Sequence, residues 1–231
     1  MIIKIPKGLF KGFKVKVQEK SSSQPSPSSP AKPPSASAPE PLNLEKELAR
    51  KPSPALISSL DDADPFVRSV SSEVLGRMKD RDAVKPLIRL LKDTSKYVRE
   101  KAAVSLGYIG DKAAVPALIE ALNDDAEDVR ITVAGVLGYL RDREAVPALI
   151  HSLSDTSPVA RMKAAISLGV IGDDEAVTAL YQAAKDENEM VRKYACEALG
   201  NIGKPAVSAL LLCLKDERIR AHAAQSLVKI K

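Results

Sequence analysis

The residues in this chain that could do chemistry are aspartates and arginines that recur together every 31 residues. Because they are paired charges in many copies, they are the first candidates for a catalytic site. The periodic charged residues are Asp62, Arg68, Asp93, Arg99, Asp124, Arg130, Asp155, Arg161, Asp186 and Arg192. A catalytic centre is normally singular, whereas these pairs occur in every unit. We therefore expect a structural ladder, in which each aspartate accepts backbone N–H groups in a turn and each arginine reaches a neighbouring aspartate.

The rest of the chain offers little for catalysis. Its two histidines, His151 and His222, are followed by serine and alanine, and no His-Glu pair occurs. The spacings of zinc ligands, the phosphate-binding loop and the nucleophile elbow are also missing. Cys196 and Cys213 occupy slots that hold serine, alanine or leucine in other repeats, which favours packing over redox or metal roles. We expect no catalytic residue, no metal and no cofactor, and predict that the protein is not an enzyme.

The charged pairs belong to a repeat, because leucine and glycine follow the same period in fixed phase. The periodic residues are Leu75, Gly76, Leu106, Gly107, Leu137, Gly138, Leu168, Gly169, Leu199 and Gly200. This period is typical of a stacked array in which each unit buries its apolar face against its neighbours. Pro86 in a first helical turn, Ser95 at an N-cap and Gly110 after a helix predict two helices per unit. We expect an all-α solenoid of about six helix–turn–helix units.

Composition divides the chain into three parts. Residues 1–20 combine six lysines with large apolar side chains, and residues 21–41 hold eight serines and seven prolines. The second composition is typical of a disordered linker. Residues 42–231 are predicted to form the solenoid, beginning with a capping helix over 42–51. The net charge of +5 lies within residues 1–41, so the basic isoelectric point does not indicate that the repeats bind nucleic acid.

The sequence favours a cytoplasmic protein. No stretch approaches the roughly 20 apolar residues that a membrane span needs. Pro6, Gly8 and Gly12 interrupt the apolar residues near the N-terminus, where a signal peptide would be continuous.

Two consecutive units carry a family resemblance: AVPALIEALNDDAEDVRITVAGVLGYLRDRE (114–144) and AVPALIHSLSDTSPVARMKAAISLGVIGDDE (145–175). They resemble the HEAT repeat superfamily, specifically the short HEAT-like repeats of phycobilisome (bilin) lyases, also called E–Z type. The resemblance implies a right-handed, armadillo-like solenoid with first helices on the convex side and second helices lining the concave side. Deoxyhypusine hydroxylases have similar repeats and hold two irons with His-Glu pairs. This chain has no such pair, so that activity does not carry over.

Positions that vary between repeats should carry the binding site. In the second helix, the positions 1, 2, 5 and 9 residues after the ladder arginine lie opposite the core stripe, on what the resemblance makes the concave face. The outer units are polar at these positions, but the middle ones are largely apolar. The predicted partner-binding residues are Tyr108, Ile131, Tyr139, Met162, Ile166, Val170 and Tyr194. Such a strip is typical of a partner site, including a homodimer, although packing between neighbouring helices could also bury it.

These observations predict a non-enzymatic protein–protein interaction scaffold or adaptor that binds a partner on the concave face. The alternative is a subunit similar to the bilin lyases, which guides a tetrapyrrole or another cofactor, because a groove with several tyrosines could hold a flat ligand. Residues 1–20 add a possible second contact. They could fold back, dock on a protein or lie weakly on an anionic membrane, while nucleic acid is less favoured.

Overall fold

The computed structural model describes residues 54–230. The basic segment 1–20, the Ser/Pro-rich segment 21–41 and the capping helix expected over 42–51 lie outside the described residues. Within residues 54–230 every regular element is a helix, and the α-helices alternate between a short and a long member of each pair. The prediction of an all-α helical-repeat solenoid is confirmed.

The first helices of the pairs are short, and most are preceded by one turn of 3₁₀-helix. They are α2 (Pro54–Ser58), α4 (Val84–Leu90), α6 (Val115–Ala121), α8 (Val146–Ser152), α10 (Val177–Ala183) and α12 (Val207–Cys213). The second helices are longer. They are α3 (Pro65–Met78), α5 (Lys96–Ile109), α7 (Glu127–Leu140), α9 (Pro158–Ile171), α11 (Glu189–Ile202) and α13 (Arg220–Lys229).

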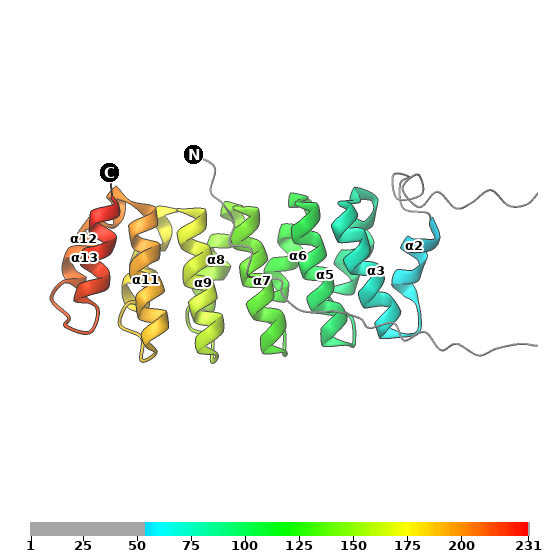
Figure 1. Cartoon of the computed structure of the whole chain (residues 1–231), viewed down its shortest axis with the longest axis horizontal. Helices are drawn as coiled ribbons and strands as arrows, with labels where there is room; N and C mark the ends of the chain where they lie inside the picture. The colour runs from blue at the N-terminus through cyan, green and yellow to red at the C-terminus, as the bar shows by residue number, and fades with distance from the viewer. Residues whose placement is uncertain (1–53, 231) are drawn as a thin grey trace, which may run out of the picture. The chain divides into compact units, whose positions relative to one another are not determined.

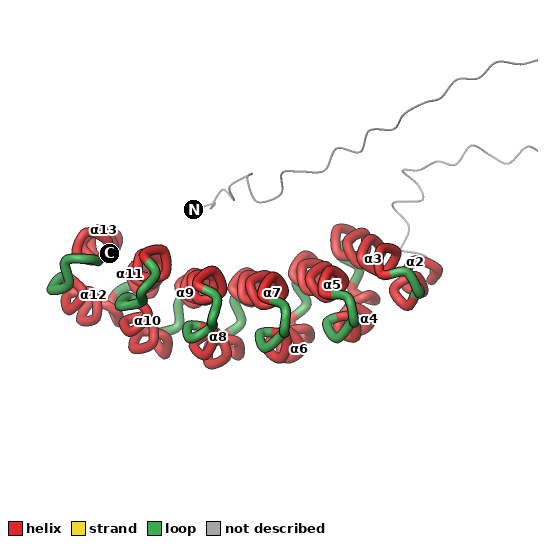
Figure 2. The backbone as a smooth tube through the Cα atoms, turned by 90° about the horizontal axis from the view of Figure 1, so that it is seen from below, coloured by secondary structure: helices red, strands yellow, loops and turns green. Residues whose placement is uncertain are grey.

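The described helices form two layers. Figure 1 shows the second helices side by side in chain order, from α3 to α13. Figure 2 shows the first helices as a separate layer beneath them, with both layers following a shallow arc. The second helices lie on the inner side of this arc, so they line its concave face, as the family resemblance implied.

Helix ends follow local sequence. The side chains of Asp64 and Asn188 accept the N–H groups of the first turns of α3 and α11, at 2.8 Å from Phe66 N and 2.9 Å from Met190 N. Ser95 occupies the N-cap of α5 as expected, but its side chain makes no capping bond; its own N–H donates to Asp93 instead. The array therefore does not depend on a capping side chain in every unit.

The core runs through the array between the two layers. In α5, Val98, Ala102 and Leu106 are fully buried, and their counterparts on one helical face of α7, α9 and α11 are at most 2 % exposed. The first helices from α4 to α12 contribute a buried leucine each, such as Leu87 and Leu118. Full burial of one such leucine is worth about 2 kcal/mol. Each unit can bury these side chains only against its neighbours, which makes the array the folding unit.

Candidate functional site

Four ladder arginines bond to the aspartate of the following unit. Arg130 shows the pattern: its Nε and Nη2 donate to the two carboxylate oxygens of Asp155 at 2.7 and 2.9 Å. Its Nη1 donates to the main-chain oxygens of Asp124 and Asp125, in the turn of its own unit, at 3.0 and 3.3 Å. Each arginine therefore ties two consecutive turns together. The paired residues are Arg68–Asp93, Arg99–Asp124, Arg130–Asp155 and Arg161–Asp186.

The paired aspartates have lowered pKa values. The hydrogen bonds from Arg130 lower the pKa of Asp155, against the opposing effect of burial. The N–H of Ser157 also donates to this carboxylate at 2.8 Å and stabilises its charged form. For Asp93, burial acts to raise the pKa, but the bonds from Arg68 and from the Ser95 N–H outweigh it. A carboxylate saturated in this way is held charged and is a poor general base at neutral pH.

The ladder changes at its C-terminal end. Arg192 donates to the main-chain oxygens of Asp186 and Glu187, but its buried Nε has no hydrogen-bond partner. Asp216, which follows α12 as Asp93 follows α4, bonds Arg218 instead, at 2.7 Å. Arg220 follows Asp216 by four positions, whereas Arg99 follows Asp93 by six. The turn between α12 and α13 is thus shorter than the others, and Arg192 and Asp216 do not form the ion pair of the other rungs. At the other end, Asp62 accepts the N–H of Asp64 at 2.8 Å.

The periodic glycines lie where neighbouring second helices pack closely. A Cβ on Gly138 would lie 2.5 Å from the Ser167 Oγ and 2.9 Å from its Cα, and one on Gly76 would lie 2.6 Å from the Ser105 Cα. The two serines are buried and donate to main-chain oxygens of the preceding unit, each at 2.7 Å. A glycine opposite a small residue thus sets the spacing between units.

The predicted concave strip differs in exposure along its length. Tyr139 is 63 % exposed, while the other six predicted residues are half-buried. Met162 packs against the buried core, so part of the strip also supports the fold. Charged pairs flank it: Lys101 bonds Glu73 at 2.8 Å, and Lys229 bonds Glu197 at 3.4 Å. The structure thus places the seven residues on second helices, with Tyr139 the most available to a partner.

The structure shows a second set of exposed apolar residues that were not predicted from the sequence. Phe66, Tyr97, Val159 and Met190 are 72 %, 66 %, 45 % and 44 % exposed. Each is two residues before a ladder arginine, in the first turn of a second helix. These four positions follow the same period of 31 residues as the ladder. They were missed because only positions after the arginine were considered.

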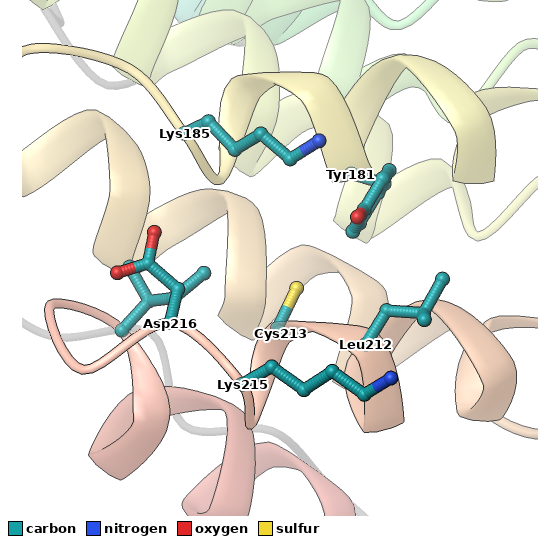
Figure 3. Close-up of a pocket in the computed structure, with 7 residues that line it drawn as sticks. Tyr181, Lys185, Leu212, Cys213, Lys215 and Asp216 are labelled. Carbon is teal, nitrogen blue, oxygen red and sulfur yellow. The ribbon is translucent and has the colours of Figure 1, made fainter.

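Two pockets lie in the C-terminal units. One of about 250 Å³ lies between α10 and α12, where Figure 3 shows Lys185 and Tyr181 facing Cys213, Leu212 and Lys215. The Lys185 Nζ is 4.0 Å from the centre of the Tyr181 ring. The other pocket, of about 270 Å³, lies between α11 and α13, and His222 and Lys229 are among the polar residues that line it. Neither pocket is lined by residues of the predicted strip.

The cysteines are free thiols within the core. Cys196 and Cys213 are 0 % and 1 % exposed. The hydrogen bond with Cys213, together with burial, raises the pKa of Cys196. Among residues 54–230, no group of three or more potential metal-ligating side chains comes together. No helix in that range is long and apolar enough to cross a membrane.

The fold and its repeated contacts define a helical-repeat solenoid. Comparison with protein families matches HEAT repeats at residues 53–130, 115–187 and 167–228. The chain therefore belongs to the HEAT repeat family, which confirms the resemblance drawn from the two units above. No curated protein matches the sequence.

Three solved structures illustrate the likeness. The complex of CpcE and CpcF of phycocyanin lyase from Nostoc sp. PCC7120 is 24% identical with a TM-score of 0.59, over 84% of this chain and 80% of that chain. A designed armadillo repeat protein in complex with the peptide (KR)4 is 18% identical with a TM-score of 0.59, over 77% and 99%. An engineered protein is 22% identical with a TM-score of 0.56, over 76% and 94%. At these sequence identities, the structural similarity is evidence for the fold of this chain.

Proposed function

We propose that this protein is a non-enzymatic interaction scaffold that binds a protein partner on the concave face of its second helices. The observation that carries the proposal is Tyr139, a large side chain that is 63 % exposed in the middle of the array. Aromatic side chains are enriched in protein interfaces, where a broad ring is buried at low entropic cost. Ile166 and Val170 of the adjacent helix α9 extend the apolar surface on the same face.

Charged residues at the two ends of the concave face favour a protein as the ligand. Glu73 bonds Lys101 and Arg77 toward the N-terminal units, and Glu197 bonds Lys229 toward the C-terminal ones. An apolar centre with a polar rim is the usual anatomy of a protein interface. Solenoids generally present such extended surfaces to partners.

A cofactor-handling role is the second candidate. It is supported by the fold likeness to the CpcE–CpcF complex. It would use tyrosines of the concave face, such as Tyr108 and Tyr194, to stack on a flat ligand. Titration with a bilin or haem separates the two roles, because a cofactor-handling protein changes the visible spectrum of the added pigment and a scaffold does not.

The scaffold proposal is tested by affinity capture with the full chain and with the double variant Tyr139→Ala/Ile166→Glu. We expect the variant to lose the partner while its melting temperature falls by only a few degrees. Leu211→Ala is the matched control, because Leu211 is 52 % exposed on α12, in the layer of first helices. Retention of the same partner by the double variant would overturn the proposal. A truncated chain, 42–231, shows whether residues 1–20 add a second contact.

A further inference from the structure

The four exposed residues Phe66, Tyr97, Val159 and Met190, which we call the turn-edge row, lie at the same position of four second helices. Each is the second residue of α3, α5, α9 or α11, next to the turn that joins the two helices of a unit. The row therefore follows the turn edge of the array. It shares no residue with the concave strip.

The fold does not require apolar side chains at these positions. In α7 the equivalent residue is Asp128, whose side chain is 63 % exposed, and this unit has the same helices and ladder contacts as its neighbours. The four apolar side chains are each at least 44 % exposed, so the core gains little from them. Large apolar groups repeated at one exposed position are typical of a surface that binds a partner.

Carboxylates surround the row. The five segments 63–66, 94–97, 125–128, 156–159 and 187–190 contain one lysine and several acidic residues: Asp64, Asp125, Glu127, Asp128, Glu187 and Glu189. All six are exposed, and Asp125 and Glu187 also pair with Arg99 and Arg161. Acidic residues are favoured at helix N-termini, which accounts for part of this pattern. Their combined field still attracts cations to the turn edge.

The one lysine in these segments shows how the surface binds a cation. The Lys96 Nζ lies 3.1 Å from the Asp128 carboxylate and 5.4 Å from the centre of the Tyr97 ring. An aromatic ring in one unit and a carboxylate in the next therefore hold a single ammonium group between them. Cation–π contact and ion pairing stabilise the same charge.

We propose that the turn-edge row binds a lysine-rich, extended peptide segment of a partner protein, with apolar side chains at about every third position. Packed helices lie about 8–10 Å apart, and three residues of an extended chain in the polyproline II conformation span about 9 Å and bring the side chain back to the same face. Apolar side chains of such a segment can contact the row residues of α3 and α5 and those of α9 and α11, while α7 between them presents Asp128. The lysines between them then meet the carboxylates in the way that Lys96 meets Asp128.

The test is fluorescence anisotropy with the full chain and a labelled synthetic peptide of about 14 residues, in which phenylalanine recurs every third position and lysine fills the others. We expect Phe66→Ser/Tyr97→Ser to weaken binding about fivefold or more, since about 1 kcal/mol corresponds to a factor of five. Glu187→Gln/Glu189→Gln should weaken binding similarly and reduce its salt dependence. A peptide with glutamate in place of lysine should not bind.

Two control variants make the result specific. Tyr139→Ser removes a residue of the concave strip that is 63 % exposed, and Glu144→Gln/Glu175→Gln removes two exposed charges from the segments between units. Both should bind the lysine peptide as the unchanged chain does. Loss of peptide binding in these controls, or unchanged binding in the two row variants, would overturn the proposal.

Folding and self-association are checked on the same samples. If the Phe66→Ser/Tyr97→Ser variant does not fold, the Val159→Ser/Met190→Ser variant tests peptide binding at the other end of the row. Row variants that change the sedimentation coefficient but not peptide binding would assign the row to contacts between copies of this chain, against the proposal. Failure here leaves the concave-face scaffold untouched, because that test uses different residues and the captured partner.

Discussion

The Arg130 guanidinium lies 2.7 Å from the carboxylate of Asp155, which is 25 residues further along the chain and in the turn of the next unit. The same arginine donates to two main-chain oxygens of its own turn. One side chain thus fixes the position of a unit relative to its neighbour. Four such contacts in series give the repeated charged residues a structural role in the array.

The ladder predicts unequal costs for two equivalent arginines. Arg130→Ala removes a largely buried ion pair and leaves Asp155 without its main partner, so it should lower the free energy of unfolding by about 2–3 kcal/mol. Arg192→Ala should cost less, because the Nε of Arg192 has no hydrogen-bond partner. Urea unfolding of both variants measures the difference. Equal losses would show that the main-chain contacts of the arginines, rather than the ion pairs, stabilise the array.

The lowered pKa values of the ladder aspartates predict acid sensitivity. A carboxylate whose pKa is lowered by folding stabilises the folded state above its unfolded pKa of about 3.9, and this contribution is lost as the pH falls through the folded pKa. The pKa of Asp155 is lowered chiefly by Arg130. The free energy of unfolding should therefore be flat near neutral pH and decline below about pH 4–5. Arg130→Ala should decline less steeply over that window. A parallel decline in the variant would contradict the assignment.

The periodic glycines predict a second matched pair. In Gly138→Ala the new Cβ would meet the Ser167 Oγ at 2.5 Å and its Cα at 2.9 Å, so the helices must separate. We expect a loss of about 1–3 kcal/mol. In Gly107→Ala the nearest atom is a methyl of Val136 at 3.1 Å, and the helix propensity gained, about 1 kcal/mol, offsets most of the strain. Thermal denaturation of the two variants tests this order, and a greater loss in Gly107→Ala would contradict it.

The buried thiols predict slow chemistry. Cys196 and Cys213 are both nearly inaccessible, and the pKa of Cys196 is raised by its hydrogen bond with Cys213 and by burial. A thiol reagent such as an aromatic disulfide should therefore react slowly with the folded protein at neutral pH and label both cysteines after unfolding. Absorbance of the released thiolate follows the reaction. Rapid labelling of the folded protein would show that one of these thiols is functional rather than a packing residue.

Sequence alone determined the repeat, its helical class and the residues of the ladder. Four residue types that recur with a period of 31 residues are compatible with few folds, because each unit must present the same face to its neighbours. Some helix ends could also be predicted from the sequence. Gly110 and Gly172 close α5 and α9 with φ values of 74° and 76°, as expected of glycine. Lys79 and Arg141 take the same left-handed conformation directly after α3 and α7, which only the structure could show.

Tertiary structure decided which apolar residues remain available. Periodicity places Tyr139 and Met162 on the same outward face, yet Tyr139 is largely exposed while Met162 packs on the core. The difference arises from packing between helices, which the periodicity of one helix does not describe. The same holds for the ladder: sequence supplied the residues, but only the packed turns decide that Arg130 meets Asp155 while Arg192 is left with an unpaired Nε.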